Sequence, residues 1–175
     1  MRIFTAIPLP KANKEKISEI TRRQLPVPYI NTSNLHLTLN FFGELTDTQT
    51  ERVKELMKGY EFPKKFKIEF DKLSRFRNQI HITIKNNLSL KTLQAQLEHA
   101  FEQAGFDLQK RSYYPHVKLA NMHMDKVMNK NRKIENFDNT KLTELSFVAD
   151  KVVLYESKLL LHHAHYTPLE EYGLR

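Results

Sequence analysis

The stretch from Leu35 to Phe41 restricts the fold more than any other part of this chain, because apolar and polar side chains alternate along it. A period of two is typical of a strand with one buried face, and the pattern ends at Gly43. Residues two apart in a strand share a face, so the imidazole of His36 and the hydroxyl of Thr38 project from the same side. The sequence therefore predicts a half-buried strand that presents a His-x-Thr pair. The expected core side holds Leu35, Leu37, Leu39 and Phe41, and the opposite side holds His36, Thr38, Asn40 and Phe42.

A second short alternating run covers residues 113–121. One side of this predicted strand holds Tyr114, His116, Lys118 and Ala120, and the other holds Val117 and Leu119. Histidine titrates near neutral pH, and a hydroxyl or an ammonium group beside it suits a phosphoryl oxygen and its leaving group. The chain thus supplies two strands that each carry a histidine with a polar neighbour two residues further on.

These two stretches resemble the paired motifs of the 2H phosphoesterases, in particular the LigT-like RNA 2′,3′-cyclic phosphodiesterases, also called the 2′–5′ RNA ligase family. Two flanking regions match as well: residues 2–7 at the start, and residues 154–158 with 166–169 near the end. The resemblance covers essentially the whole chain. The second motif departs from the family, since Lys118 stands where the family has threonine and Asn121 stands where it usually has arginine.

The pattern of elements predicts an α+β fold with antiparallel sheets. The expected strands are 2–7, the His36 strand, 66–70, 80–84, the His116 strand, 145–155 and 159–166, and the expected helices are 11–24, 46–57 and 89–104. No linker rich in Gly, Ser or Pro divides the chain, so residues 1–175 are expected to form one domain. The resemblance implies two pseudo-symmetric lobes of antiparallel sheet backed by helices. One motif strand from each lobe would face an active-site cleft between them.

The resemblance also implies a function. It predicts metal-independent hydrolysis of RNA 2′,3′-cyclic phosphate ends to 2′-phosphates, with the reverse reaction joining RNA ends by a 2′–5′ bond. His36 and His116 would be the catalytic acid–base pair, and Thr38 and Lys118 would bind the substrate phosphate. In the family the first-motif histidine is the acid and the second is the base. The sequence of this chain does not by itself orient the pair.

The net charge of +8 and the pI near 9.6 favour a polyanionic partner, with nucleic acid ahead of an anionic membrane surface. A well-solvated basic surface explains the same charge. Because the chain has no cysteine, disulfides and thiolate ligands are excluded, which suits the cytoplasm. No apolar run is long enough to span a bilayer. We therefore expect a monomeric cytoplasmic protein with no membrane contact, whose partner is an RNA end, tRNA fragments included.

Two other histidine patterns compete with this assignment. The segment His81-Ile82-Thr83 is a literal His-x-Thr, but the resemblance places it outside both motifs, so we expect a cleft-lining or exposed histidine there. The residues His123, His162, His163 and His165 fit no familiar metal-ligand spacing, and we expect neither a metal nor a cofactor.

Basic and aromatic residues outside the two motifs are candidates for RNA contacts. We expect the segment 72–78 to form a basic connection, in which Arg75 and Arg77 would hold phosphates and Phe76 would stack on a base. Phe42 and Tyr114 are further candidates for base contacts, and Lys110-Arg111 for phosphate contacts. Solvated loops are the alternative explanation for these basic segments.

Two other functions remain open at this point. The chain would be a non-catalytic or weakly active RNA-end binder if its second motif is degenerate, with Lys118 turned to solvent. It would be a hydrolase of small nucleotides if it lacks extended RNA contacts. We expect instead that Lys118 replaces the threonine, because an ammonium group reaches a phosphoryl oxygen as a point charge.

Overall fold

The computed structural model describes residues 1–25, 32–108, 112–121, 134–160 and 164–175. Its strands are β1 (Arg2–Pro8), β2 (His36–Glu44), β3 (Phe66–Phe76), β4 (Gln79–Ile84), β5 (His116–Asn121), β6 (Ser146–Ala149), β7 (Lys151–Leu159) and β8 (Ala164–Gly173). Its helices are α1 (Lys11–Gln24), the 3₁₀ turn η1 (Thr32–Asn34), α2 (Asp47–Gly59), α3 (Leu88–Gln103) and α5 (Thr140–Thr143).

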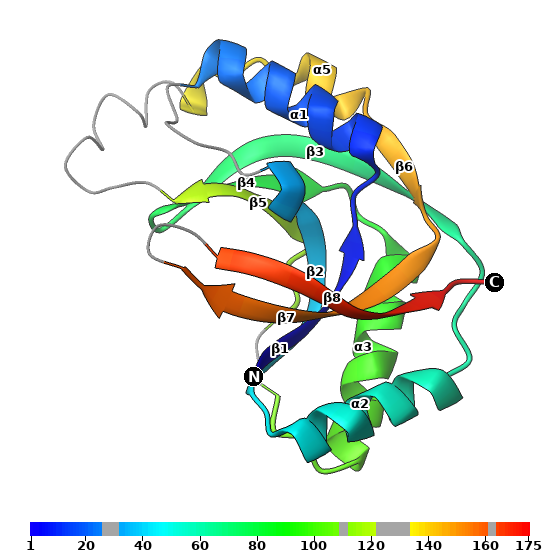
Figure 1. Ribbon diagram of the computed structural model, residues 1–175. Coiled ribbons are helices and arrows are strands. Elements are labelled where there is room, and N and C mark those ends of the chain that lie inside the picture. The colour runs from blue at the N-terminus through cyan, green and yellow to red at the C-terminus, as the bar shows by residue number, and fades with distance from the viewer. Residues whose placement is uncertain (26–31, 109–111, 122–133, 161–163) are drawn as a thin grey trace.

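The strands form one curved sheet in the order β6-β3-β4-β5-β2-β1-β7-β8, and every neighbouring pair is antiparallel (Figure 1). The order divides into two halves of equal size, β6-β3-β4-β5 and β8-β7-β1-β2. In each half the innermost strand carries one of the two predicted motifs. The α+β prediction with two related lobes is confirmed, with the lobes as halves of a continuous sheet that meet at β5 and β2.

Two groups of helices flank the sheet. The helices α1 and α5 lie together at one end of the molecule, and α2 and α3 lie together at the other (Figure 1). Helix α2 begins at a capping box, in which the Thr46 hydroxyl accepts from the Gln49 backbone N–H and the Gln49 side chain accepts from the Thr46 N–H. The N-cap of α3 is Asn87. These caps fix where each helix leaves the sheet.

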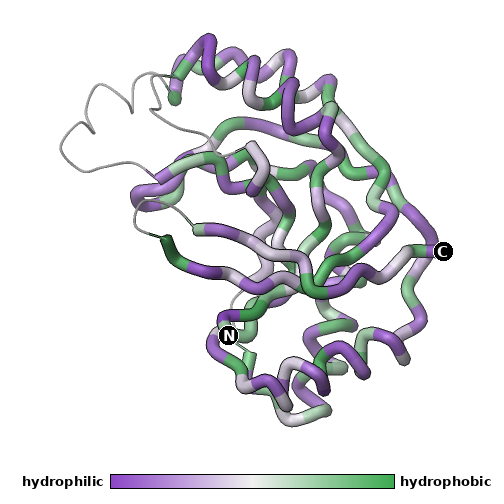
Figure 2. The backbone as a smooth tube through the Cα atoms, in the orientation of Figure 1, coloured by the Kyte–Doolittle hydropathy of each residue, from purple (hydrophilic) through white to green (hydrophobic). Residues whose placement is uncertain are grey.

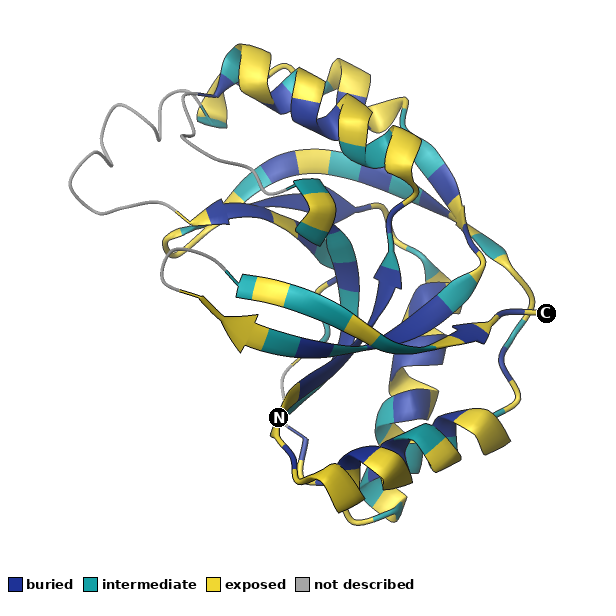
Figure 3. Cartoon of the chain, in the orientation of Figure 1, coloured by how far each residue is buried: buried dark blue, intermediate teal, exposed yellow. Residues whose placement is uncertain are grey.

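The core lies between the sheet and the helices, and the alternation of the strands supplies it. Leu35, Leu37 and Leu39 are buried as predicted. Figure 3 shows the central strands mostly buried, with exposed residues along the outer sides of the helices. Figure 2 shows α1 as a mostly hydrophilic helix, and it packs through Ile17, Ser18 and Thr21.

The expected basic connection over 72–78 is wrong. Strand β3 continues to Phe76, and a tight turn at Arg77 and Asn78 leads directly into β4. Leu73 is buried while its charged neighbours face outward, so the alternation of a strand persists beneath the charges. Arg77 closes the turn with φ +53, in the left-handed region.

The expected single strand over 145–155 is two strands. The chain breaks at Asp150, and β6 pairs with β3 while β7 pairs with β1, so the two strands extend different halves of the sheet. The last strand, β8, runs to Gly173, well beyond the expected end at Tyr166. Among the described residues no helix is long and apolar enough to cross a membrane.

Candidate active site

The strand registers place six polar residues side by side at the centre of the sheet. Leu37 on β2 pairs with Val117 on β5, so antiparallel pairing sets His36 across from Lys118 and Thr38 across from His116. On the other side of β5, His81 of β4 pairs with Lys118 and Thr83 pairs with His116. The two motif strands are therefore direct neighbours, and the rival His-x-Thr of β4 lies next to them.

His36 and His116 are held by the same backbone contact. The Nδ1 of His36 lies 2.5 Å from the carbonyl oxygen of Asn34, and the Nδ1 of His116 lies 2.8 Å from that of Tyr114. Since a carbonyl only accepts hydrogen bonds, each Nδ1 carries the proton. The Nε2 atom of each neutral ring is then left to accept a proton, and in His36 it lies 3.1 Å from the Thr38 hydroxyl.

The ring of His36 is enclosed by aromatic side chains. Phe4 and Tyr166 lie 5.1 Å away between ring centroids, with Tyr166 edge-on at 89°, and Tyr155 lies at 6.2 Å. The pKa of His36 is lowered to about 4, chiefly by burial; the hydrogen bond to the Asn34 carbonyl opposes this shift, and the charges of Lys14, His116 and Lys118 add to it. His36 is therefore neutral at neutral pH.

The sequence did not identify Phe4, Tyr155 and Tyr166 as site residues. They lie in the flanking segments that carry the resemblance, but no local pattern there indicates contact with His36. The contact depends on sheet order, because β1 lies between β2 and β7 and pairs Phe4 with Tyr155. Those two rings stack at 5.2 Å and form the wall beside His36.

The ring of His116 has a different neighbour. His81 stacks on it with centroids 4.1 Å apart and an angle of 20° between the ring planes. His81 is only 4% exposed, so it lines the site as a buried residue and the alternative of an exposed histidine is wrong. Burial lowers the pKa of His81 to about 4, and the charges of His116 and Lys118 contribute in the same direction. Tyr114, 62% exposed, lies 6.4 Å from His116.

Lys118 lies on β5, across from His36 of β2 on one side and His81 of β4 on the other. Its side chain is exposed, yet neighbouring protein atoms displace enough water to lower the pKa of its ammonium group.

Tyr113 lies just before β5, and its hydroxyl donates a hydrogen bond to the Thr38 carbonyl at 3.0 Å. Burial raises the pKa of Tyr113, so its hydroxyl stays protonated. This hydrogen bond connects the segment just before β5 to β2, the strand of the first motif.

Comparison with known proteins places this arrangement in a family. The model of the 2′-5′ RNA ligase superfamily matches residues 8–159. The chain belongs to that superfamily. A relative from Methanocaldococcus jannaschii, named RNA 2′,3′-cyclic phosphodiesterase, is 25% identical over 98% of this chain and 100% of its own length. One of the same name from Bacillus subtilis is 28% identical over 67% of this chain and 69% of its own.

Solved structures show that the superfamily fold extends over the whole chain. A crystal structure of E. coli LigT complexed with 3′-AMP matches with a TM-score of 0.80 and 21% identity, covering 99% of this chain and 97% of that one. The apo form of LigT matches with a TM-score of 0.79. At this identity the match establishes the shared fold. Site residues must therefore be assigned from this chain's own geometry.

Phe42 does not share a face with His36 and Thr38, so its predicted place on their side of the strand is wrong. The β1–β2 pairing has two irregularities, one between Thr5 and Ala6 and one between Ile3 and Phe4. They break the alternation after Leu39. As a result Phe41 pairs with Phe4, and Phe42 packs against Phe101 and Phe106 on the α3 side at 4.8 and 5.6 Å.

Three of the other predicted RNA contacts, Arg75, Phe76 and Arg77, lie at the end of the β3–β4 hairpin. Phe76 is 61% exposed, and the guanidinium of Arg77 lies 5.4 Å from its ring centroid. The Nε of Arg75 donates to the Arg77 carbonyl at 2.7 Å. Phe76 pairs with Gln79, whose side chain contacts His81, so the hairpin joins the edge of the histidine site.

The histidines weighed as metal ligands do not form a site in the described part of the chain, where no three His, Cys, Asp or Glu residues are grouped for a metal. His165 is exposed on β8, while His123, His162, His163 and the Lys110-Arg111 pair lie outside the described residues.

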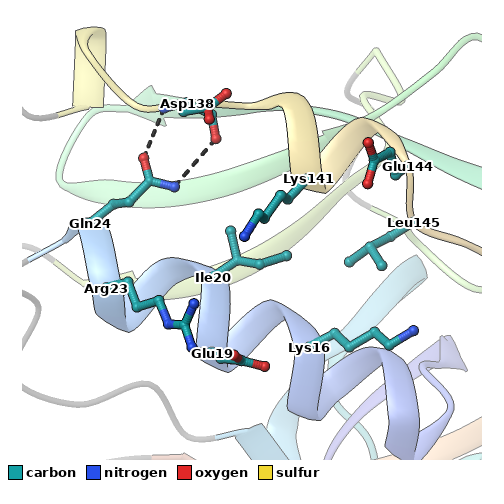
Figure 4. Close-up of a pocket in the computed structure, with 9 residues that line it drawn as sticks. All are labelled: Lys16, Glu19, Ile20, Arg23, Gln24, Asp138, Lys141, Glu144 and Leu145. Carbon is teal, nitrogen blue, oxygen red and sulfur yellow. Dashed lines mark hydrogen bonds and ion pairs between the residues drawn. The ribbon is translucent and has the colours of Figure 1, made fainter.

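A hollow of about 400 Å³ lies away from the histidines, between α1 and the segment around α5 (Figure 4). It is lined by Lys16, Glu19, Ile20, Arg23, Gln24, Asp138, Lys141, Glu144 and Leu145.

Proposed function

We propose that this protein hydrolyses RNA 2′,3′-cyclic phosphate ends to 2′-phosphates, with His36 and His116 as an acid–base pair. The main support is that the two rings lie on adjacent strands and are held in the same way. Each ring bonds through Nδ1 to the carbonyl oxygen of the residue two positions earlier. The names of the relatives and the superfamily membership support the same reaction.

The chemistry needs one proton given and one proton taken. One histidine accepts a proton through Nε2 from a water molecule as that water's oxygen attacks phosphorus. The bond from phosphorus to the ribose 3′ oxygen breaks, and the other histidine donates its Nε2 proton to that oxygen. The product keeps the phosphate on the 2′ oxygen. The same steps, with the 5′ hydroxyl of a second RNA end in place of water, would join two RNA ends by a 2′–5′ bond, and the 3′ oxygen would again leave as a hydroxyl.

The roles of the two histidines depend on the bound phosphate. With a pKa of about 4, His36 is neutral at neutral pH and, in that state, can act as a base. The assignment implied by the family, with His36 as the acid, requires the anionic phosphate to raise its pKa toward neutrality. A negative charge within the aromatic enclosure acts in that direction, because nearby rings exclude the water that would screen it.

Thr38 and Lys118 are proposed to bind the phosphoryl oxygens. Thr38 already contacts the Nε2 of His36, and Lys118 lies across from His36 in the strand register. A hydroxyl and an ammonium group both stabilise the negative charge that builds on phosphorus-bound oxygens in the transition state. The hairpin residues Arg75, Phe76 and Arg77, with Tyr114, would hold the rest of the RNA end.

An oligonucleotide bearing a terminal 2′,3′-cyclic phosphate tests this function. Incubation in excess EDTA is expected to yield only the 2′-phosphate, and the His36→Ala and His116→Ala variants are expected to form it several orders of magnitude more slowly. His99→Ala is the matched control, since His99 is an exposed histidine on α3. If the protein binds the oligonucleotide but does not hydrolyse it, it is an RNA-end binder. This is the second candidate function, and the presence of Lys118 in place of the motif threonine favours it.

The dependence of binding on salt separates RNA from a small nucleotide as substrate. Each phosphate neutralised by lysine or arginine releases counterions, so affinity for an RNA that spans several phosphates falls steeply with added salt. We expect a much steeper salt dependence for the oligonucleotide than for a 2′,3′-cyclic mononucleotide. Equal dependences would favour the small nucleotide.

A further inference from the structure

We propose that His81 is a positioning residue for the reaction assigned above, whose buried ring stacks on His116 and fixes the plane in which that histidine acts. The inference rests on the proposed function, but its geometry is independent of it. The two rings are nearly parallel, at 20°, with centroids 4.1 Å apart. The candidate site then contains three histidines: His36 and His116 exchange protons, and His81 positions His116.

His81 is itself held in place from more than one side. Its strand lies between β3 and β5, and its register partners are Ser74 and Lys118. Its Nε2 lies 3.0 Å from the Oε1 of Gln79, and because that oxygen accepts, Nε2 carries the proton. The atom that His36 and His116 present to a substrate is thus occupied in His81. The face of the ring contacts His116, while its Nε2 proton is bonded to Gln79.

The ring of His116 needs such a support more than that of His36 does. His116 is the first residue of its strand, and Tyr114 lies at the longer distance of 6.4 Å. The bond from Nδ1 to the Tyr114 carbonyl anchors one atom of the ring but leaves rotation of the ring plane to be set by packing. The face of His81 supplies that packing surface.

The other half of the sheet shows what this position does. His81 lies on β4, the strand next to the second motif, and Phe4 lies on β1, the strand next to the first motif. Phe4 contacts His36 with centroids 5.1 Å apart, as His81 contacts His116. A phenyl ring cannot exchange a proton, so the role shared by the two positions is packing against the motif histidine.

The charges around His81 keep its ring suited to this role. The groups that act on it are His116 and Lys118 of β5, both of which disfavour a charge on His81, and burial acts in the same direction. On the neighbouring strand β3, the carboxylate of Asp71 accepts a hydrogen bond from Thr83 at 3.0 Å. When His116 takes up a proton, it therefore stacks on a neutral ring, and no repulsion between two imidazolium rings arises.

Replacement of His81 by phenylalanine and by alanine tests the proposal. On a cyclic-phosphate substrate, His81→Ala is expected to lower kcat by about tenfold to a hundredfold with little change in KM, the usual effect of a misplaced catalytic group. His81→Phe keeps a flat ring on His116 and is expected to recover most of that loss. His99→Ala again controls for removal of a histidine elsewhere.

A structural readout separates failure of this inference from failure of the proposed function. The ring protons of His116 are expected to move downfield in the NMR spectrum of His81→Ala, because the shielding from the stacked ring is lost, and to stay shielded in His81→Phe. This holds even if the protein hydrolyses nothing. Unchanged His116 signals in folded His81→Ala would overturn the proposal. So would a His81→Phe variant as inactive as His81→Ala, because the nitrogen atoms would then be what matters.

Discussion

The two motif histidines share an anchor and differ in everything around it. His36 and His116 each bond through Nδ1 to the carbonyl two residues earlier, which gives the rings the same tautomer. His36 is surrounded by three aromatic rings, whereas the ring neighbours of His116 are His81 and the exposed Tyr114. The first motif ends in Thr38 and the second in Lys118.

This difference shows how a nearly symmetric sheet can support an asymmetric reaction. An acid–base pair must begin in opposite protonation states, yet two identical surroundings would give two identical rings. The common backbone bond sets which nitrogen would face a substrate in the proposed mechanism, and the side chains from neighbouring strands set how readily each ring takes a proton. Changing those neighbours should therefore alter one histidine at a time.

The largest expected effect follows from removing either motif histidine. His36→Ala and His116→Ala should each lower kcat by several orders of magnitude while the protein stays folded, since a positioned acid or base contributes about 10²–10⁴-fold. The double variant should be little worse than either single one, because the residues act as a unit. Single-turnover rates measure this. If His81→Ala were as damaging as His36→Ala, with His116→Ala mild, the assignment of the second motif would be wrong.

A smaller effect is expected at Lys118, where the two motifs differ in sequence. Lys118→Ala should lower kcat/KM by at least about tenfold, equivalent to roughly 1.4 kcal/mol of transition-state stabilisation. Lys118→Thr, which restores the first motif's pattern, should recover part of the loss. Steady-state kinetics on a cyclic-phosphate substrate decide this. A neutral alanine variant together with a threonine variant more active than the parent would indicate a degenerate second motif.

The aromatic wall should control the protonation of His36 alone. Tyr166→Ala opens the edge-on side of the ring to water, so the pKa of His36 should rise from about 4 toward its ordinary value. Titration of the histidine ring signals by NMR measures the change. The signals of His116 should titrate as in the parent, and a variant in which both rings shift equally would contradict the separation of the two environments.

A further effect is on stability. Folded His36 and His81 have pKa values of about 4, below the ordinary value near 6.5, so between these pH values the unfolded chain binds more protons. The unfolding free energy should therefore be fully present above about pH 6.5 and fall as the pH approaches 4, by up to about 1.4 kcal/mol per pH unit for each histidine. Urea unfolding across this range measures the slope. His36→Ala and His81→Ala should each flatten it, and an unchanged slope in both would refute the burial argument.

Much of the fold could be predicted because local patterns and tertiary packing agree. Helix α1 lies over Lys11–Gln24, as expected from its pattern, and α2 begins at the Thr46 cap. The errors fall where pairing overrides pattern. The charged residues in the second half of β3 made it look like a loop, although the strand continues to Phe76. The break at Asp150 was missed because it depends on β6 and β7 pairing with opposite halves of the sheet.

The site was predictable in part for the same reason. Alternation identified His36 and His116 and their polar neighbours, since these contacts run along one strand. It missed Phe4, Tyr155 and Tyr166 and undervalued His81, whose contacts run across strands and depend on sheet order. It also misplaced Phe42, because irregular pairing of β1 with β2 breaks the alternation after Leu39, which strict alternation cannot anticipate.

The most direct test of the two-histidine account is the pH dependence of cyclic-phosphate hydrolysis in excess EDTA, measured for the parent and for each histidine variant. The parent should give a bell-shaped profile of kcat against pH, because one ring must carry a proton and the other must not. The residual activity of His36→Ala should lose one limb of the bell, and that of His116→Ala the opposite limb. A profile that keeps both limbs in either variant, or activity that returns only when a divalent ion is added, would contradict the account.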